Sequence, residues 1–105
     1  MELKEILEFI DYEHNRLIAH FRNDDGEPKR IFKYERLAKL MEEVGELSDA
    51  ILHSDNSQRK EKIPASVEHE CADVIITTLL LSKEMDIDIA KALEEKIEKI
   101  KNRVY

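Results

Sequence analysis

The sequence predicts an all-α protein, and three features of the chain support that prediction. Glycine and proline occur only twice each in 105 residues, which leaves few places for tight turns between strands. Apolar residues make up 42% and charged residues 39% of the chain, a balance typical of amphipathic helices. Apolar residues also recur at helical spacing in four separate stretches. We therefore expect a four-helix bundle.

The first predicted helix covers residues 3–21, and residues 23–26 form a turn cluster that ends in glycine. The second helix is expected over residues 28–53, with Pro28 at its first position. Gly45 inside this helix costs about 1 kcal/mol relative to alanine, which indicates close approach of another helix or a ligand. The side chains expected to point inward are Ile31, Leu37, Leu40, Val44, Leu47 and Ile51.

A polar stretch, residues 54–64, is the predicted loop before the third helix. Ser66 can cap that helix, and Glu68 in its first turn favours the helix dipole. The helix should extend to about Glu84. Its apolar residues are so dense over residues 71–81 that we expect burial on most of its circumference.

Asp86 or Asp88 is the predicted cap of the fourth helix. Its apolar residues follow alternating steps of three and four, the spacing of a bundle or coiled-coil seam: Ala90, Leu93, Ile97, Ile100 and Val104. Residues 1–105 should form a single domain. Four helices of this length give a thin core, so we expect a homodimer or homotetramer.

Charge and composition exclude several classes of function. The net charge of −7 argues against binding to a nucleic-acid polymer, which requires a basic surface. The longest apolar run, residues 74–81, is far shorter than the roughly 20 residues of a membrane span. Cys71 is the lone cysteine, and no signal peptide precedes the first helix, so we expect a cytoplasmic protein.

Two acidic pairs are the candidate site. Glu43 and Glu46 lie three residues apart, on one face of the second predicted helix, and Glu70 and Asp73 repeat this spacing on the third. Acidic pairs on helices are usually solvated, and a base such as Lys39 could neutralise the pair of Glu70 and Asp73. Because Asp73 precedes an apolar run, however, we expect it in a low-dielectric setting where an unpaired charge is costly. Four converging carboxylates then predict a divalent cation.

The same residues carry a family resemblance. The chain contains the segments EEVGEL and ECAD, with 23 residues between Glu46 of the first and Glu70 of the second. Together they resemble the EExxE…ExxD signature of MazG-like all-α nucleoside triphosphate pyrophosphohydrolases. The resemblance covers about residues 32–103, and it implies that Glu43, Glu46, Glu70 and Asp73 bind Mg²⁺, which Mn²⁺ can replace. It further implies catalytic roles for Glu43 and for Glu42, an accessory carboxylate near the metal or its water.

The resemblance implies cleavage of an NTP or dNTP between its α- and β-phosphates, giving a nucleoside monophosphate and pyrophosphate, with nucleotide-pool housecleaning as a role. Candidate phosphate-binding residues are Lys39, Lys96, Lys99 and Arg103, although Ile100 stands where many relatives carry asparagine. Two alternatives remain open: a phosphoribosyl-ATP pyrophosphohydrolase-like enzyme, and a non-catalytic helical interaction module with solvated acids. A di-iron bundle is excluded because no histidine follows a glutamate by three residues.

Overall fold

The computed structural model describes residues 1–21, 32–54 and 66–105, and every regular element in these ranges is an α-helix. The predicted all-α fold with four helices is therefore confirmed. The predicted turn at residues 23–26, the helix start at residues 28–31 and most of the loop before Ser66 lie outside the described residues. The helices are α1 (Leu3–His20), α2 (Phe32–Ser54), α3 (Val67–Glu84) and α4 (Ile89–Lys101).

Two helix starts are set by local side-chain chemistry. The Oγ atom of Ser66 accepts a hydrogen bond from the backbone N–H of His69 at 3.3 Å, which makes Ser66 the cap of α3 as predicted. Asp88 is the cap of α4, because its Oδ1 atom accepts from the N–H of Lys91 at 3.1 Å. The other candidate, Asp86, instead adopts a left-handed backbone conformation with φ of 55° in the turn between α3 and α4.

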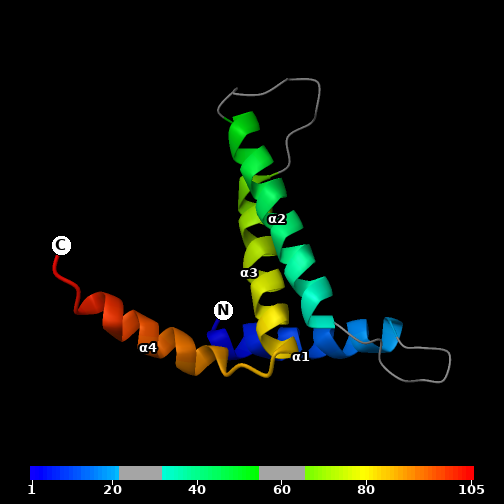
Figure 1. Ribbon diagram of the computed structural model, residues 1–105, viewed down its shortest axis with the longest axis horizontal. Coiled ribbons are helices and arrows are strands. Elements are labelled where there is room, and N and C mark those ends of the chain that lie inside the picture. The colour runs from blue at the N-terminus through cyan, green and yellow to red at the C-terminus, as the bar shows by residue number, and fades with distance from the viewer. Residues whose placement is uncertain (22–31, 55–65) are drawn as a thin grey trace.

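The helices do not enclose one common core. Helices α2 and α3 run side by side in opposite directions, and α1 lies across the end of this pair where α2 begins and α3 ends (Figure 1). Helix α4 leaves the same end and extends away from the pair (Figure 1). It packs against none of the other helices as α2 packs against α3. None of the described helices is long and apolar enough to span a membrane.

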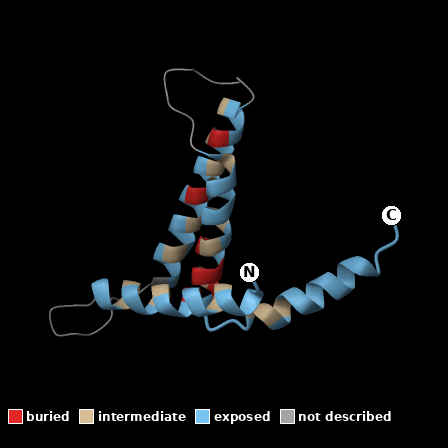
Figure 2. Cartoon of the chain, turned by 180° about the vertical axis from the view of Figure 1, so that it is seen from behind, coloured by how far each residue is buried: buried red, intermediate tan, exposed pale blue. Residues whose placement is uncertain are grey.

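The small apolar core lies where α1 crosses α3. Ile10, Leu79 and Leu80 are buried there, and the surrounding half-buried side chains include Leu17 and Ile89. Ile89 is the first residue of α4, so this core holds the start of α4, while α4 is exposed from Leu93 onward (Figure 2).

The structure corrects the predicted inward face of α2. Leu37, Val44 and Ile51 were expected to point inward, but all three are exposed, and the face toward α3 holds the buried Glu43 and Ala50. Helix α2 carries apolar side chains on two faces, and among the residues that the structure describes only the face toward α3 is covered. Leu40 and Leu47 lie between the two faces and are half-buried. Ile31 lies outside the described residues.

The predicted burial of α3 is also only partly correct. Its second half is enclosed between α1 and α2, and Thr77, Leu79 and Leu80 are buried. In the first half Cys71 is exposed, and Ile75 leaves 57% of its surface accessible. The reason is geometric: α1 crosses only the end of the pair, so α2 is the one described helix that covers the first half of α3 (Figures 1 and 2).

Candidate metal centre

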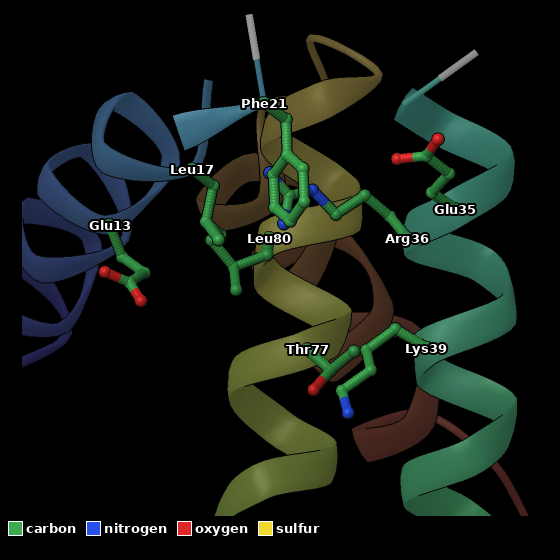
Figure 3. Close-up of a pocket in the computed structure, with 8 residues that line it drawn as sticks. All are labelled: Glu13, Leu17, Phe21, Glu35, Arg36, Lys39, Thr77 and Leu80. Carbon is green, nitrogen blue, oxygen red and sulfur yellow. The ribbon is translucent and has the colours of Figure 1, made fainter. Parts of the chain in front are cut away.

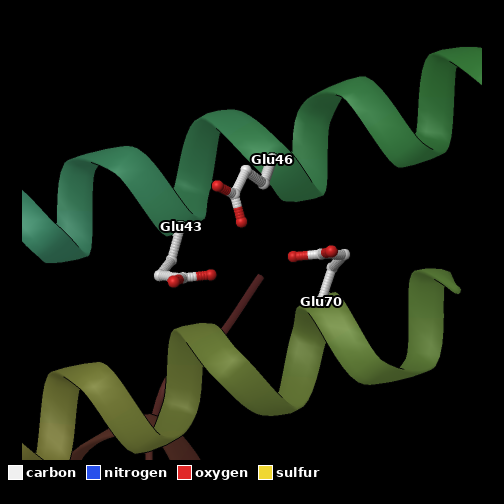
Figure 4. A group of neighbouring side chains, drawn as sticks. All are labelled: Glu43, Glu46 and Glu70. Atoms are coloured by element: carbon white, nitrogen blue, oxygen red, sulfur yellow. The ribbon is translucent and has the colours of Figure 1, made fainter. Parts of the chain in front are cut away.

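Three carboxylates converge in the space between α2 and α3. Glu43 and Glu46 come from α2 and Glu70 from α3, and their side chains point toward one another (Figure 4). One carboxylate oxygen from each lies within 4.8 Å of the other two. The spacing of three residues puts Glu43 and Glu46 on one face, and the antiparallel pairing of the two helices brings Glu70 opposite them. We call these three residues the carboxylate cluster.

The cluster has acceptor atoms that the described protein atoms do not satisfy. Glu43 is only 7% exposed, and its Oε2 atom is buried without a hydrogen-bond partner among them. Glu70 is half-buried, and its Oε2 atom is in the same situation. Buried carboxylate oxygens normally accept hydrogen bonds or bind cations, so two such atoms facing a third carboxylate form an arrangement suited to a cation.

The electrostatic environment of Glu46 reflects the same crowding. The charge of Glu43 is the largest cause that raises the pKa of Glu46, followed by desolvation, by a hydrogen bond with Glu43 and by the charges of Glu70 and Glu42. Repulsion among like charges favours the protonated form of a carboxyl group. A divalent cation would remove this repulsion and favour the ionised form.

Lys39 offsets part of the negative charge. Its Nζ atom lies 3.3 Å from Oε1 of Glu43 and 3.5 Å from Oε2 of Glu42, and the hydrogen bond with Glu43 is the main cause that raises the lysine pKa. The predicted accessory carboxylate Glu42 is thus exposed beside the cluster and paired with the same lysine. One ammonium group leaves the second oxygen of Glu43 without a partner among the described residues.

The structure does not place Asp73 in the cluster. Its side chain is exposed, so the low-dielectric setting expected from the sequence is not found in the single chain. The reason is that its neighbours Cys71, Ala72 and Ile75 are themselves exposed, in the half of α3 that α2 but no other described helix covers. Asp73 still lies one helical turn after Glu70, at the border of the site.

The predicted phosphate-binding residues divide into two groups. Lys39 is at the cluster, whereas Lys96, Lys99 and Arg103 lie on α4 or just beyond its end and are exposed. Since α4 extends away from α2 and α3, a single chain does not bring these three residues to the carboxylates (Figure 1).

An interhelical pocket, which the sequence did not predict, adjoins the cluster. This cavity of about 380 Å³ lies among α1, α2 and α3 and reaches the cluster through Lys39 (Figure 3). The buried Nε atom of Arg36 has no hydrogen-bond partner among the described residues. The lining residues are Glu13, Leu17, Phe21, Glu35, Arg36, Lys39, Thr77 and Leu80.

A spacing signal for this pocket was present in the sequence. Arg36 precedes Glu43 by seven residues and Thr77 follows Glu70 by seven, so each lies two helical turns from a cluster residue on the same helix face. Extending the two acidic faces along their helices would have found both residues. The contribution of α1 has no such signal, because it depends on the angle at which α1 crosses the pair.

Comparison with known families supports the family resemblance that the acidic residues carry. The family model for the MazG nucleotide pyrophosphohydrolase domain matches residues 33–104, well over half of the chain. Comparison with curated proteins found no match, and neither did comparison with solved structures. The matched range contains all three residues of the carboxylate cluster as well as α4. The chain therefore belongs to the MazG nucleotide pyrophosphohydrolase family.

Proposed function

We propose that this chain is a Mg²⁺-dependent pyrophosphohydrolase that cleaves an NTP or dNTP between its α- and β-phosphates, giving a nucleoside monophosphate and pyrophosphate. The observation that carries the proposal is the carboxylate cluster, with two buried oxygens that lack partners among the described residues. Its position within the matched MazG domain supports a nucleotide substrate. We expect the enzyme to act in the cytoplasm, where a reducing environment protects the exposed thiol of Cys71.

The donor set fits Mg²⁺. This ion prefers oxygen ligands, is held by a few carboxylates and shares its coordination shell with substrate phosphates. Glu43, Glu46 and Glu70 would hold the ion, and Asp73 would join them from the next turn of α3. Mn²⁺ accepts the same ligands. When bound, the ion supplies Lewis-acid neutralisation of the phosphate charge.

The chain's own residues would position the reactants and move one proton. The oxygen of a water molecule attacks the α-phosphorus, the bond between this phosphorus and the bridging oxygen breaks, and pyrophosphate leaves. We assign Glu42 to accept the proton of that water, because its carboxylate is exposed beside the cluster. Glu43 contributes by keeping the carboxylates of the site in place, because its side chain is buried and forms an ion pair with Lys39. The Lys39 ammonium is placed to pair with a substrate phosphate.

The interhelical pocket would hold the nucleoside. It combines apolar walls with a few polar groups, as pockets for small organic ligands usually do. Phe21 offers an aromatic face to a base, and Arg36 offers a donor without a partner among the described residues. Lys39 lines the pocket and also contacts Glu43, so a bound nucleotide could extend from this pocket to the cluster (Figure 3).

Pyrophosphate release tests the proposal. Canonical and modified nucleotides are screened with Mg²⁺, and the nucleoside product is identified as mono- or diphosphate. We expect monophosphate and pyrophosphate from the wild type and a loss of at least a hundredfold in kcat for Glu46→Gln. Glu94→Gln makes the same chemical change on α4 and should retain full activity. Inactivity on every nucleotide, or a diphosphate product, would contradict the proposed reaction.

Saturable Mg²⁺ binding distinguishes this function from that of a non-catalytic interaction module. Calorimetric titration of metal-free protein should show one class of site in the wild type and much weaker binding in Glu70→Gln. A chain whose acids are merely solvated would show no saturable binding in either protein.

A further inference from the structure

Two charged side chains in the wall of the interhelical pocket have buried atoms with unused hydrogen-bonding capacity. Arg36 on α2 has a buried Nε–H group without an acceptor among the described residues. Glu13 on α1 has a buried Oε1 atom that lacks a well-aligned donor in the same part of the chain. Buried polar atoms are normally paired in a folded protein. The pocket therefore offers a cationic donor and an anionic acceptor to a ligand.

Glu13 is held from the solvent side by Arg16. The Nε atom of Arg16 lies 2.7 Å from Oε1 of Glu13 in an ion pair, but its N–H bond is not aligned with that oxygen. A hydrogen bond with Tyr12 is the main cause that raises the pKa of Arg16, and the hydrogen bond with Glu13 is the smallest. The Arg16 side chain is 62% exposed and that of Glu13 only 20%. Arg16 thus fixes a carboxylate that can still accept hydrogen bonds from the pocket side.

The two charged groups lie on different walls of the cavity. Because α1 crosses the end of the α2–α3 pair, Glu13 and Arg36 come from helices that meet at an angle (Figure 1). Figure 3 shows Glu13 and Arg36 on opposite sides of the apolar residues Leu17 and Leu80. The cavity of about 380 Å³ is in the size range of small-molecule pockets. A flat ligand with apolar faces and polar edges fits this arrangement, as a nucleic-acid base does.

The chemistry of the two groups selects among the bases. A carboxylate accepts best from two adjacent N–H donors, and an arginine donates best to two adjacent acceptors. Guanine offers both patterns. Its N1–H and its 2-amino group stand side by side on one edge, while O6 and N7 are acceptors on the neighbouring edge. Arginine paired with O6 and N7 is also the commonest specific contact of proteins to guanine in DNA.

The other bases leave at least one of the charged groups mismatched. Adenine would turn the lone pair of N1 toward the carboxylate and its amino group toward the guanidinium. Cytosine has one amino donor next to an acceptor, and the N–H of uracil or thymine lies between two carbonyl groups that repel a carboxylate. A buried charged group left without its partner is costly, which is why sites built on hydrogen bonds discriminate strongly.

We propose that the interhelical pocket is selective for guanine. The carboxylate of Glu13 accepts from N1–H and the 2-amino group, and Nε with one terminal nitrogen of Arg36 donates to O6 and N7. Lys39 leads from the pocket to the carboxylate cluster, so the phosphates extend toward it. A guanine nucleoside triphosphate as the substrate rests on the proposed function, whereas the selectivity of the pocket for the base does not.

Binding of uncharged nucleosides to metal-free protein tests the selectivity without hydrolysis. The methyl resonances of Leu17 and Leu80 are followed by NMR during titration with guanosine, inosine, 7-deazaguanosine and adenosine. Inosine lacks the 2-amino group and 7-deazaguanosine lacks N7. We expect saturable binding of guanosine, with a Kd at least tenfold below that of each other nucleoside. Absence of saturable guanosine binding, or a Kd of inosine or adenosine equal to that of guanosine, overturns the inference.

Two variants assign each edge of the base to its residue. Glu13→Ala should bind guanosine and inosine equally and still discriminate against 7-deazaguanosine. Arg36→Ala should show the converse, with guanosine and 7-deazaguanosine bound equally. The matched control Glu8→Ala removes an exposed carboxylate from α1 outside this pocket and should keep both differences. A variant that retains the difference expected to disappear overturns the assignment of its residue.

Folding of the variants is checked by circular dichroism. Should an alanine variant lose the helicity of the wild type, Glu13→Gln or Arg36→Lys replaces it. Each of these keeps the size of the side chain and should narrow the corresponding ratio of Kd values at least threefold. An unchanged ratio overturns the assignment in the same way.

Hydrolysis with Mg²⁺ separates this inference from the proposed function. The value of kcat/KM should be at least tenfold higher for dGTP than for dITP, dATP, dCTP or dTTP. Equal values for dGTP and dITP overturn the guanine selectivity and leave the pyrophosphohydrolase reaction intact. Selective binding of guanosine by a protein that releases pyrophosphate from none of these nucleotides refutes the proposed function and leaves the selectivity of the pocket intact.

Discussion

Binding of Mg²⁺ should raise the melting temperature of the protein because it relieves a cost built into the native state. Three carboxylates converge, Lys39 supplies one nearby ammonium group, and the buried Oε2 atoms of Glu43 and Glu70 have no partner among the described residues. Each buried acceptor of this kind costs on the order of 1–3 kcal/mol. In the unfolded chain the three carboxylates are separated and solvated, so the ion binds the native state preferentially.

Mass action sets the expected size of the effect. At a hundredfold excess of free Mg²⁺ over Kd, the free energy of unfolding rises by about 2.7 kcal/mol. A chain of 105 residues unfolds with an entropy of about 0.2 kcal/mol per kelvin near its melting temperature. The melting temperature should therefore rise by about 12 °C.

Differential scanning calorimetry of EDTA-stripped protein measures this shift. All scans use one protein concentration and one ionic strength, adjusted with NaCl, so that association and screening stay constant. Glu46→Gln should lose most of the shift, whereas Glu94→Gln on α4 should retain it. A wild-type melting temperature that millimolar Mg²⁺ leaves unchanged would refute the metal site.

Three further predictions concern residues around the site. Asp73→Asn should abolish nucleotide hydrolysis. Because Asp73 is exposed, the same variant should change the free energy of unfolding of the metal-free protein by less than about 0.5 kcal/mol in urea titration. A variant that still hydrolyses nucleotides would exclude Asp73 as a metal ligand. Arg36→Ala should raise KM about tenfold with kcat nearly unchanged, since the pocket residue would bind substrate and transition state alike; a fall in kcat alone would contradict this. Burial is the main cause that lowers the pKa of His14 from its ordinary value of 6.5, against the opposing charge of Glu84 at 3.5 Å. Below pH 6.5 the unfolded chain then binds more protons than the native chain, so the free energy of unfolding should fall as pH drops from 6.5 toward the lowered pKa. His14→Gln should remove this contribution to the pH dependence in urea titrations at several pH values. An equally steep profile in the variant would be evidence against His14 as its source.

Sequence alone determined the features that depend on near neighbours. The caps Ser66 and Asp88 act on N–H groups three residues further along, so their effect is independent of the rest of the fold. The convergence of Glu43, Glu46 and Glu70 could also be anticipated, because helical spacing fixes the first pair and helices that follow one another in a bundle commonly pack as antiparallel neighbours.

Tertiary structure decided which of several equivalent surfaces is used. Helix α2 has two apolar faces of helical period, and periodicity cannot say which one meets α3; the buried face turned out to contain Glu43 rather than Val44. The exposure of Asp73 depends on how far along α3 the crossing helix α1 reaches, a distance that no local pattern encodes. The direction of α4 likewise depends on the turn at Asp86, where a left-handed residue points the helix away from the pair and leaves its apolar stripe uncovered. A pattern of side chains records that a face must be buried, but only the packed structure shows whether the same chain covers it.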